Sequence, residues 1–275
     1  MKIALIQQNA SMDREANRQK GLSAVKEAAR NGAQIIGFAE LAFEPFYPQK
    51  PASGYVLRFA ETIPGHTTER FAALAKESEV VIVLNLFERE RNKTFDTSPV
   101  IDADGKIQGI TRMVHITDYP CFHERGYYSP GDKGAPVYDT AYGKIGVAVC
   151  YDRHYPEYMR ALALKGAEIV FIPQAGAVDE WPDGLYEAEM RVTAFQNGYF
   201  TALCNRVGEE EFLTFAGESF ICDPYGEVIA RAGKQSEEIL YCDVDLKQVK
   251  TSHAKKLFLA DRRPELYRDW LVDKG

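Results

Sequence analysis

Short apolar runs rich in β-branched residues alternate with helix-like patterns in this 275-residue chain, and this alternation limits the folds available to it. Strand-like runs stand at 3–7, 35–38, 80–86 and 145–150, and helical spacing of apolar residues stands at 17–30 and 67–76. Thr67 or Thr68 is expected to cap the second helix. Alternating strands and helices predict an α/β fold. The runs at 100–101 and 106–112 flank a turn and predict a hairpin, so mixed sheets are expected rather than purely parallel ones.

Composition and charge exclude several classes of protein. Hydrophobic residues make up 45% and charged residues 27% of the chain, as in soluble globular proteins. No Pro-, Gly- or Ser-rich linker divides it, so one domain is expected over 1–275, with a charged tail at 255–275 that lies on the surface or on a partner. A net charge of −7 without a basic run argues against nucleic acid and anionic membranes as partners.

The five cysteines are odd in number and unclustered, which favours reduced thiols and hence a cytoplasmic location. No signal peptide and no run of membrane-spanning length is visible.

Cys150 is the best candidate for a nucleophile. It ends the apolar run 145–150, and Pro156 soon afterwards suits the first turn of a helix. A thiol on a strand-to-helix elbow lies near backbone N–H groups and a positive helix end, and both favour the thiolate. The alternative is a buried structural cysteine, a common role for this residue.

Two glutamates are candidates for acid–base chemistry. Glu40 ends the apolar run 35–39 and precedes Leu41, so desolvation should raise its pKa toward that of a base working near neutrality. The alternative is a strand-end glutamate paired with a surface lysine. Glu124 stands among aromatic residues, and its alternative is a loop salt bridge. No Gly-x-Ser-x-Gly elbow is present. The spacing of His115, Cys121 and His123 matches no recognisable zinc pattern.

Several segments in order resemble the nitrilase, or carbon–nitrogen hydrolase, superfamily over nearly the whole chain. The matching segments are 37–41, 122–124, 128–132, 145–152, 156–157, 165–169, 205–208, 217–221 and 262–267. The resemblance implies an α-β-β-α sandwich with two mixed sheets and helices outside, which commonly assembles into homodimers or higher homo-oligomers. It also implies hydrolysis of non-peptide C–N bonds through a cysteine acyl intermediate, without a metal or cofactor.

The resemblance assigns roles to particular residues. Cys150 corresponds to the nucleophile, Glu40 to the general base and Glu124 to a supporting carboxylate, while the backbone N–H of Tyr151 helps to hold the oxyanion. The segments 151–154 and 262–267 lean toward the branches that act on N-carbamoyl amines or amino acids, so a small amide or ureido substrate is expected. Apart from the resemblance, His115 is a possible residue of the substrate pocket. Arg153, Gln174 and Glu187 could contact substrate, and each of these three is equally compatible with a structural role.

One position departs from the family pattern. The family has Arg-Lys-x-His, with the lysine assisting the oxyanion, whereas this chain has Met113 between Arg112 and Val114. Methionine donates no hydrogen bond, and losing one oxyanion donor costs about 10²–10³ in rate. In a strand, Arg112 would face away from the site and His115 would share the side of Met113. In an irregular segment this alternation does not apply.

Three explanations for Met113 remain open. The residue is natural, with altered chemistry or another donor; it is a deliberate substitution; or the chain is a non-catalytic relative kept for ligand binding or as a scaffold. The presence of Cys150, Glu40 and Glu124 favours an active-type site.

Overall fold

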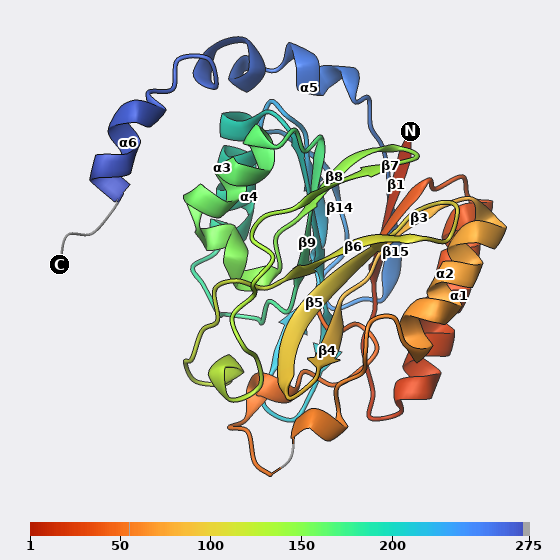
Figure 1. Ribbon diagram of the computed structural model, residues 1–275. Helices are drawn as coiled ribbons and strands as arrows, with labels where there is room; N and C mark the ends of the chain where they lie inside the picture. Colours follow the sequence, from red (N-terminus) through yellow and green to blue (C-terminus); the bar gives the residue numbers. More distant parts are fainter. Residues whose placement is uncertain (55, 272–275) are drawn as a thin grey trace.

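Two mixed β-sheets pack face to face and helices cover their outer faces (Figure 1). The computed structural model describes residues 1–54 and 56–271. The first sheet has the order β15 (Glu238–Asp243), β1 (Lys2–Gln7), β2 (Ile35–Phe38), β3 (Val81–Val83), β5 (Lys93–Ile101) and β4 (Leu86–Glu90), and β6 (Ile107–Arg112) also pairs with β5. The second has the order β14 (Val228–Arg231), β13 (Phe220–Cys222), β10 (Phe200–Asn205), β9 (Ile169–Gln174), β8 (Gly143–Val147) and β7 (Val137–Thr140). A separate pair is formed by β11 (Val207–Glu209) and β12 (Thr214–Ala216).

Helices α1 (Arg14–Arg30) and α2 (His66–Ser78) cover the first sheet, and α3 (Pro156–Leu164) and α4 (Leu185–Asn197) cover the second (Figure 1). In each sheet three neighbouring strands are parallel, β1-β2-β3 and β8-β9-β10, and antiparallel strands complete the edges. The predicted α-β-β-α sandwich with mixed sheets is therefore confirmed. Parallel strands bring their carboxyl ends to one edge, where ligands bind in open α/β sheets.

The main core lies between the sheets. Ile35 from β2 and Val147 and Phe171 from the second sheet belong to one cluster of buried side chains. A Cβ atom on Gly37 would stand 2.6 Å from the ring of Phe171, so glycine lets the sheets approach closely here. The separation of the two sheets is thus set by tight contacts directly behind the end of β2.

Three boundaries differ from the sequence-based expectation. Helix α1 begins at Arg14 rather than 17, because the Asp13 carboxylate caps it by accepting from the backbone N–H of Glu15 and Ala16. Helix α2 is capped at Gly65, so capping by Thr67 or Thr68 was wrong; Thr68 instead accepts from the Gly65 N–H. The single strand expected at 80–86 is two strands, because the chain leaves the sheet at Leu84–Asn85.

The chain after β15 runs along the outside of the sandwich. It forms α5 (Lys247–Thr251), a π-helical turn (Ala254–Phe258) and α6 (Pro264–Leu271), and α6 lies apart from the main body in Figure 1. No residue of α6 is buried within the described chain. None of the described helices has the length and apolar content to cross a membrane.

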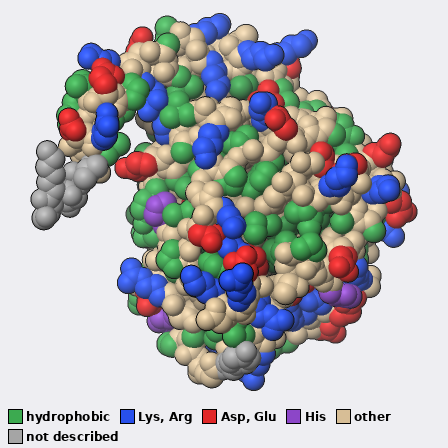
Figure 2. Space-filling view, viewed as in Figure 1, with side chains coloured by type: hydrophobic (Ala, Val, Ile, Leu, Met, Phe, Trp, Pro, Cys, Tyr) green, Lys and Arg blue, Asp and Glu red, His purple; other side chains and the backbone are tan. Residues whose placement is uncertain are grey.

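Charged side chains are mixed over the face shown in Figure 2. Lys and Arg stand among Asp and Glu there, rather than gathering into one basic patch.

Candidate active site

Cys150 occupies the predicted strand-to-helix elbow. Strand β8 ends at Val147, and Cys150 opens a short 3₁₀ turn (Cys150–His154) that leads to Pro156 at the start of α3. Its φ of +41° lies in the left-handed region, which non-glycine residues rarely adopt outside functional or tightly constrained sites. The residue is 5% exposed, so the thiol is almost closed off from solvent.

Glu40 reaches the same place from the opposite sheet. It follows β2, is fully buried, and has its pKa raised to about 7 by burial and by the charge of Glu124, while Asp96 and the Cys150 thiol lower it. The expected rise in pKa is confirmed, and the alternative of a surface lysine partner is wrong, since Glu40 enters no ion pair in the described residues. Neither carboxylate oxygen has a hydrogen bond of ordinary geometry within residues 1–54 and 56–271.

The surroundings of Cys150 favour the thiol, and the expectation of a stabilised thiolate was wrong. Burial raises the pKa of Cys150 well above its usual value, and the charge of Glu40 raises it further; the Arg153 charge lowers it by less. Residue spacing indicated the elbow but not how deeply the sulfur is buried. A neutral thiol makes an adjacent proton acceptor necessary, and Glu40 has a pKa that suits the task.

Glu124 is a second enclosed carboxyl group. It begins a 3₁₀ turn (Glu124–Gly126) and accepts a hydrogen bond from the Thr117 N–H at 3.2 Å. Burial is the main cause that raises its pKa well above the usual range. It makes no salt bridge in the part of the chain that is described, which contradicts the alternative of a loop salt bridge.

Asp96 is a buried site residue that sequence reasoning missed. It lies on β5, is fully buried, and accepts a hydrogen bond from Asn85. Burial and the charge of Glu40 raise the pKa of Asp96 well above normal, so a neutral Asp96 can donate its proton toward Glu40. Asn85 also accepts from the Leu41 N–H at 2.8 Å, which ties this pair to the residue after Glu40. The available signal was an acidic residue in the otherwise apolar and hydroxylated run 95–101.

Arg206 also went unassigned, although its segment matched the family pattern. It is 1% exposed, and its Nη1 donates to the main-chain carbonyl of Glu40 at 2.9 Å. Its Nη2 donates to the carbonyl of Glu44 at 3.1 Å. An arginine after β10 thus fixes the backbone that carries Glu40.

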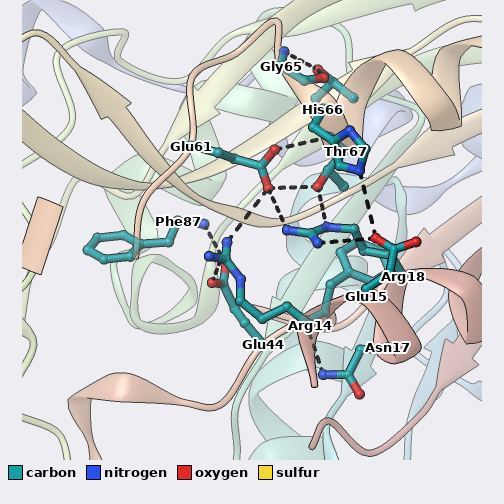
Figure 3. Close-up of polar contacts among 12 residues, drawn as sticks. Arg14, Glu15, Asn17, Arg18, Glu44, Glu61, Gly65, His66, Thr67 and Phe87 are labelled. Atoms are coloured by element: carbon teal, nitrogen blue, oxygen red, sulfur yellow. Dashed lines mark hydrogen bonds and ion pairs between the residues drawn. The ribbon is translucent and has the colours of Figure 1, made fainter. Parts of the chain in front are cut away.

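The loop after Glu40 also takes part in an ionic cluster through Glu44, which pairs with Arg14 (Figure 3). The Glu44 carboxylate lies 3.1 Å from Arg14 of α1 and accepts from the Phe87 N–H at 3.3 Å. Arg14 also approaches Glu61 at 3.9 Å. Burial raises the pKa of Glu44, and the Arg14 charge opposes that rise.

Met113 lies in the same buried cluster as Cys150 and is 1% exposed. Strand β6 ends at Arg112, so the alternation of sides does not extend to 113–116. Arg112 does face away, into ion pairs with Glu88 at 2.6 Å and Asp132 at 2.9 Å. That Met113 stands in the functional place of the family lysine stays a prediction.

The His115 side chain contacts Asp152 and Tyr155. Its Nδ1 lies 2.7 Å from an Asp152 oxygen, and its ring stacks on Tyr155 with centroids 3.4 Å apart. His123 lies beside Asp118, at 3.2 Å. Among residues 1–54 and 56–271, no group of three or more His, Cys, Asp or Glu is arranged to hold a metal ion.

Arg153 and Gln174 lie together beside Cys150. Arg153 Nη1 donates to the Cys150 carbonyl at 2.9 Å and to Gln174 Oε1 at 2.8 Å, and its Nε donates to Glu189 at 3.1 Å. The Gln174 Nε2 is buried and has no partner in the described residues. Glu187 instead pairs with Arg231 at the surface.

A cavity of about 510 Å³ is lined by residues that include Tyr186, Asn205 and Gly217. Glu40, Glu124 and Cys150 are not among its lining residues.

Comparison with known proteins agrees with this geometry. The carbon-nitrogen hydrolase family pattern matches residues 2–254. An N-carbamoylputrescine amidase from Solanum lycopersicum is 37% identical over 287 residues, covering 99% of this chain and 95% of that protein. A carbon-nitrogen hydrolase from Helicobacter pylori G27 has a TM-score of 0.92 at 30% identity, covering 99% of this chain and 98% of that one.

A mutant amidase from Nesterenkonia sp. AN1 has a TM-score of 0.82 at 26% identity, covering 98% of this chain and 96% of that one. Its structure shows the acetamide moiety of fluoroacetamide added covalently at the active-site cysteine. The chain described here belongs to the carbon–nitrogen hydrolase family.

Proposed function

We propose that this protein hydrolyses a small N-carbamoyl or carboxamide substrate through an acyl intermediate on Cys150. The observation that carries the proposal is the buried Cys150 thiol beside Glu40, whose pKa is raised to about 7. The covalent adduct on the active-site cysteine of the Nesterenkonia amidase supports the same role for Cys150. The N-carbamoylputrescine amidase relative supports a ureido substrate.

The proposed reaction has two halves. Glu40 takes the thiol proton while the Cys150 sulfur attacks the ureido carbonyl carbon. The C–N bond to the terminal nitrogen breaks, and ammonia leaves with the proton that Glu40 held. A water molecule then loses a proton to Glu40 and attacks the carbonyl carbon of the resulting S-carbamoyl intermediate. The C–S bond breaks, and the Cys150 sulfur takes the proton back from Glu40. The released carbamic acid decomposes to carbon dioxide and the amine.

The oxyanion of each half-reaction needs donors. The Tyr151 backbone N–H, which follows the nucleophile, is proposed as one of them. Glu124 is proposed to keep the pocket polar and to position the substrate. Met113 supplies no donor, and its presence favours a second candidate function, a catalytically impaired or non-enzymatic ligand-binding or scaffold member of the same fold.

Two measurements test the proposal. Ammonia release is followed on a panel of ureas and carboxamides, and intact-protein mass is recorded after brief exposure to substrate. Activity and a mass adduct are expected from the starting protein and from Cys204→Ala, which removes another buried thiol on β10, but not from Cys150→Ala. If no compound is cleaved beyond the Cys150→Ala background, while ligand binding survives in both forms, the binding candidate replaces this one.

The proposal includes the setting expected from the family. We expect one domain over 1–275 that forms a homodimer or a higher homo-oligomer, which light scattering of the full chain checks. We also expect a cytoplasmic location and no binding of nucleic acid, and fractionation of the source cells checks the location.

A further inference from the structure

We propose that the Tyr128 hydroxyl is a hydrogen-bond donor of the catalytic centre, and that it donates to the carbonyl oxygen of the substrate as the oxyanion forms. This inference rests on the proposed function and adds a catalytic residue to that site. Met113 supplies no donor, so a second donor besides the Tyr151 N–H has to come from elsewhere in the chain.

Main-chain hydrogen bonds place Tyr128 beside the strand that carries Asp96. The N–H of Ser129, the next residue, donates to the carbonyl of Thr94 on β5 at 2.8 Å. The N–H of Tyr128 itself donates to the carbonyl of Glu124 at 2.8 Å. Tyr128 therefore lies between the turn that carries one buried acid of the site and the strand that carries another.

The same segment also borders Met113. The Gly131 N–H donates to the Met113 carbonyl at 2.8 Å, and the Met113 N–H donates to the Asp96 carbonyl at 2.9 Å. The stretches of backbone that carry Tyr128, Asp96 and Met113 are thus joined to one another. The tyrosine and the methionine therefore approach the site from neighbouring segments.

The Tyr128 side chain is buried and its hydroxyl is unpaired. Only 4% of the residue is exposed, and the hydroxyl has no hydrogen-bond partner among residues 1–54 and 56–271. A buried phenol normally finds a partner, because an unpaired one bears the full cost of leaving water. The ring packs edge-to-face against Phe87, with centroids 5.4 Å apart, so the hydroxyl has a defined direction.

Other unpaired polar atoms belong to the same centre. Both carboxylate oxygens of Glu40, Asp96 Oδ2 and Glu124 Oε1 are buried without a partner in the described part of the chain. Burial is the main cause that raises the pKa of Tyr128 well above normal, and the charges of those three carboxylates add to the rise. Buried polar atoms are almost always paired in proteins, so this group of unpaired atoms marks a space that a polar substrate fills.

A neutral phenol suits the task. Because its pKa is raised, the Tyr128 hydroxyl keeps its proton at every pH at which Glu40 acts as a base. As the Cys150 sulfur attacks, the carbonyl oxygen of the substrate gains negative charge and accepts the hydrogen bond more strongly. The proton stays on Tyr128 throughout, so the two half-reactions balance as before.

The test compares Tyr128→Phe with Tyr127→Phe, which removes the same hydroxyl from the adjacent residue. Burial raises the pKa of Tyr127 and the charge of the exposed Lys50 lowers it, so the hydroxyl of this control lies toward the surface. For the best urea or carboxamide of the panel, Tyr128→Phe should lower kcat by about 10²-fold, the usual effect of one oxyanion donor. Tyr127→Phe should leave kcat within about threefold, and a loss in Tyr128→Phe confined to KM would contradict the inference.

Urea unfolding separates this role from a structural one. A hydroxyl that has no partner in the fold does not stabilise it, so Tyr128→Phe should keep or raise the urea midpoint. A lower midpoint, or a variant that does not fold, would assign the hydroxyl a structural role and overturn the inference.

Inhibition by butanal reports on the oxyanion itself. The Cys150 sulfur forms a bond to the aldehyde carbon, the C=O group becomes C–O⁻, and Glu40 keeps the thiol proton. Tyr128→Phe should weaken this inhibition by about tenfold or more, and Tyr127→Phe should leave it within about threefold. Equal inhibition of the two variants would count against a donor at Tyr128.

The failures are distinguishable. If the starting protein turns over substrate and the two tyrosine variants have equal kcat, the role of Tyr128 is overturned and the hydrolase proposal stands. Absence of turnover for every urea and carboxamide, with no adduct on Cys150, overturns both.

Discussion

Arg206 Nη1 donates a hydrogen bond to the main-chain carbonyl of Glu40 at a distance of 2.9 Å. The side chain reaches Glu40 from the end of β10 in the opposite sheet, so a cation from one half of the sandwich fixes the backbone of the proposed base in the other. The same guanidinium holds the Glu44 carbonyl, and its removal would leave several buried acceptors unpaired.

Arg206→Met should therefore destabilise the fold and reduce activity. Loss of a buried charge that serves several acceptors is expected to cost about 3–5 kcal/mol in the free energy of unfolding, measured by urea titration. Arg231→Met, which breaks the more exposed pair with Glu187, should cost less than about 1 kcal/mol. Equal losses in the two variants would contradict a special role for Arg206.

The pH dependence of kcat/KM should show an acidic limb with an apparent pKa of about 7. Below this pH Glu40 holds a proton and cannot accept one from the thiol, so activity falls as the pH falls. The raised pKa also means that the fold binds a proton more tightly than the unfolded chain does, so this group's contribution to stability is lost as the pH rises through about 7. Glu40→Gln should abolish turnover and raise the melting temperature more at pH 8 than at pH 5.

Asp96 should affect the pH at which kcat/KM falls on the acidic side of the profile. Because its side chain lowers the pKa of Glu40, Asp96→Ala should move the acidic limb to higher pH. Asp96→Asn keeps a donor and should move it less. The measurement is the pH profile of kcat/KM for each variant, and a shift to lower pH in Asp96→Ala would be inconsistent with a donating Asp96.

Arg153 should govern the reactivity of the thiol. Its charge lowers the pKa of Cys150, so Arg153→Gln should raise that pKa further and slow alkylation by iodoacetamide at pH 8. Arg153→Lys retains a charge and should fall between the two. Rates are measured over a range of pH, with Cys150→Ala to identify the sulfur that reacts.

Met113→Lys tests the unusual position directly. If this residue occupies the functional place of the family lysine, the substitution should raise kcat by roughly 10²-fold, the usual effect of one oxyanion donor. Met113→Leu changes shape with little change in polarity and should leave kcat within about threefold. A lysine variant no faster than the leucine variant, in a protein that already turns over substrate, would show that another group serves the oxyanion.

Local sequence patterns were sufficient to predict the strands and helices that form the layers of this fold, and the strand-to-helix elbow at Cys150. The spacing of apolar residues identified most strands and helices, and Pro156 marked the helix that follows Cys150. The start of α1 was missed because Asp13 extends the helix by one turn of polar residues, which apolar periodicity does not register. The strand at 80–86 was misjudged because Asn85 turns inward to Asp96, a contact over 11 residues.

The chemistry of the candidate site depended on distant contacts. Nothing near Cys150 in the sequence shows that its thiol is enclosed and faces Glu40, so local helix-end effects suggested a thiolate where burial favours the thiol. Arg206 lies 166 residues from Glu40, and His115 lies 37 residues from Asp152. Such pairs form only when the two sheets pack together.

Glu40 follows a strand of one sheet and Cys150 follows a strand of the other, and the ring of Phe171 packs against Gly37 between the two sheets. The spacing of the proposed base and nucleophile is thus inherited from the thickness of the hydrophobic interior. A methyl group added at Gly37 would push the two sheets apart and so increase the distance between Glu40 and Cys150, although it contacts neither residue. Residues that do not contact the substrate can therefore change the reaction rate that we propose for this site.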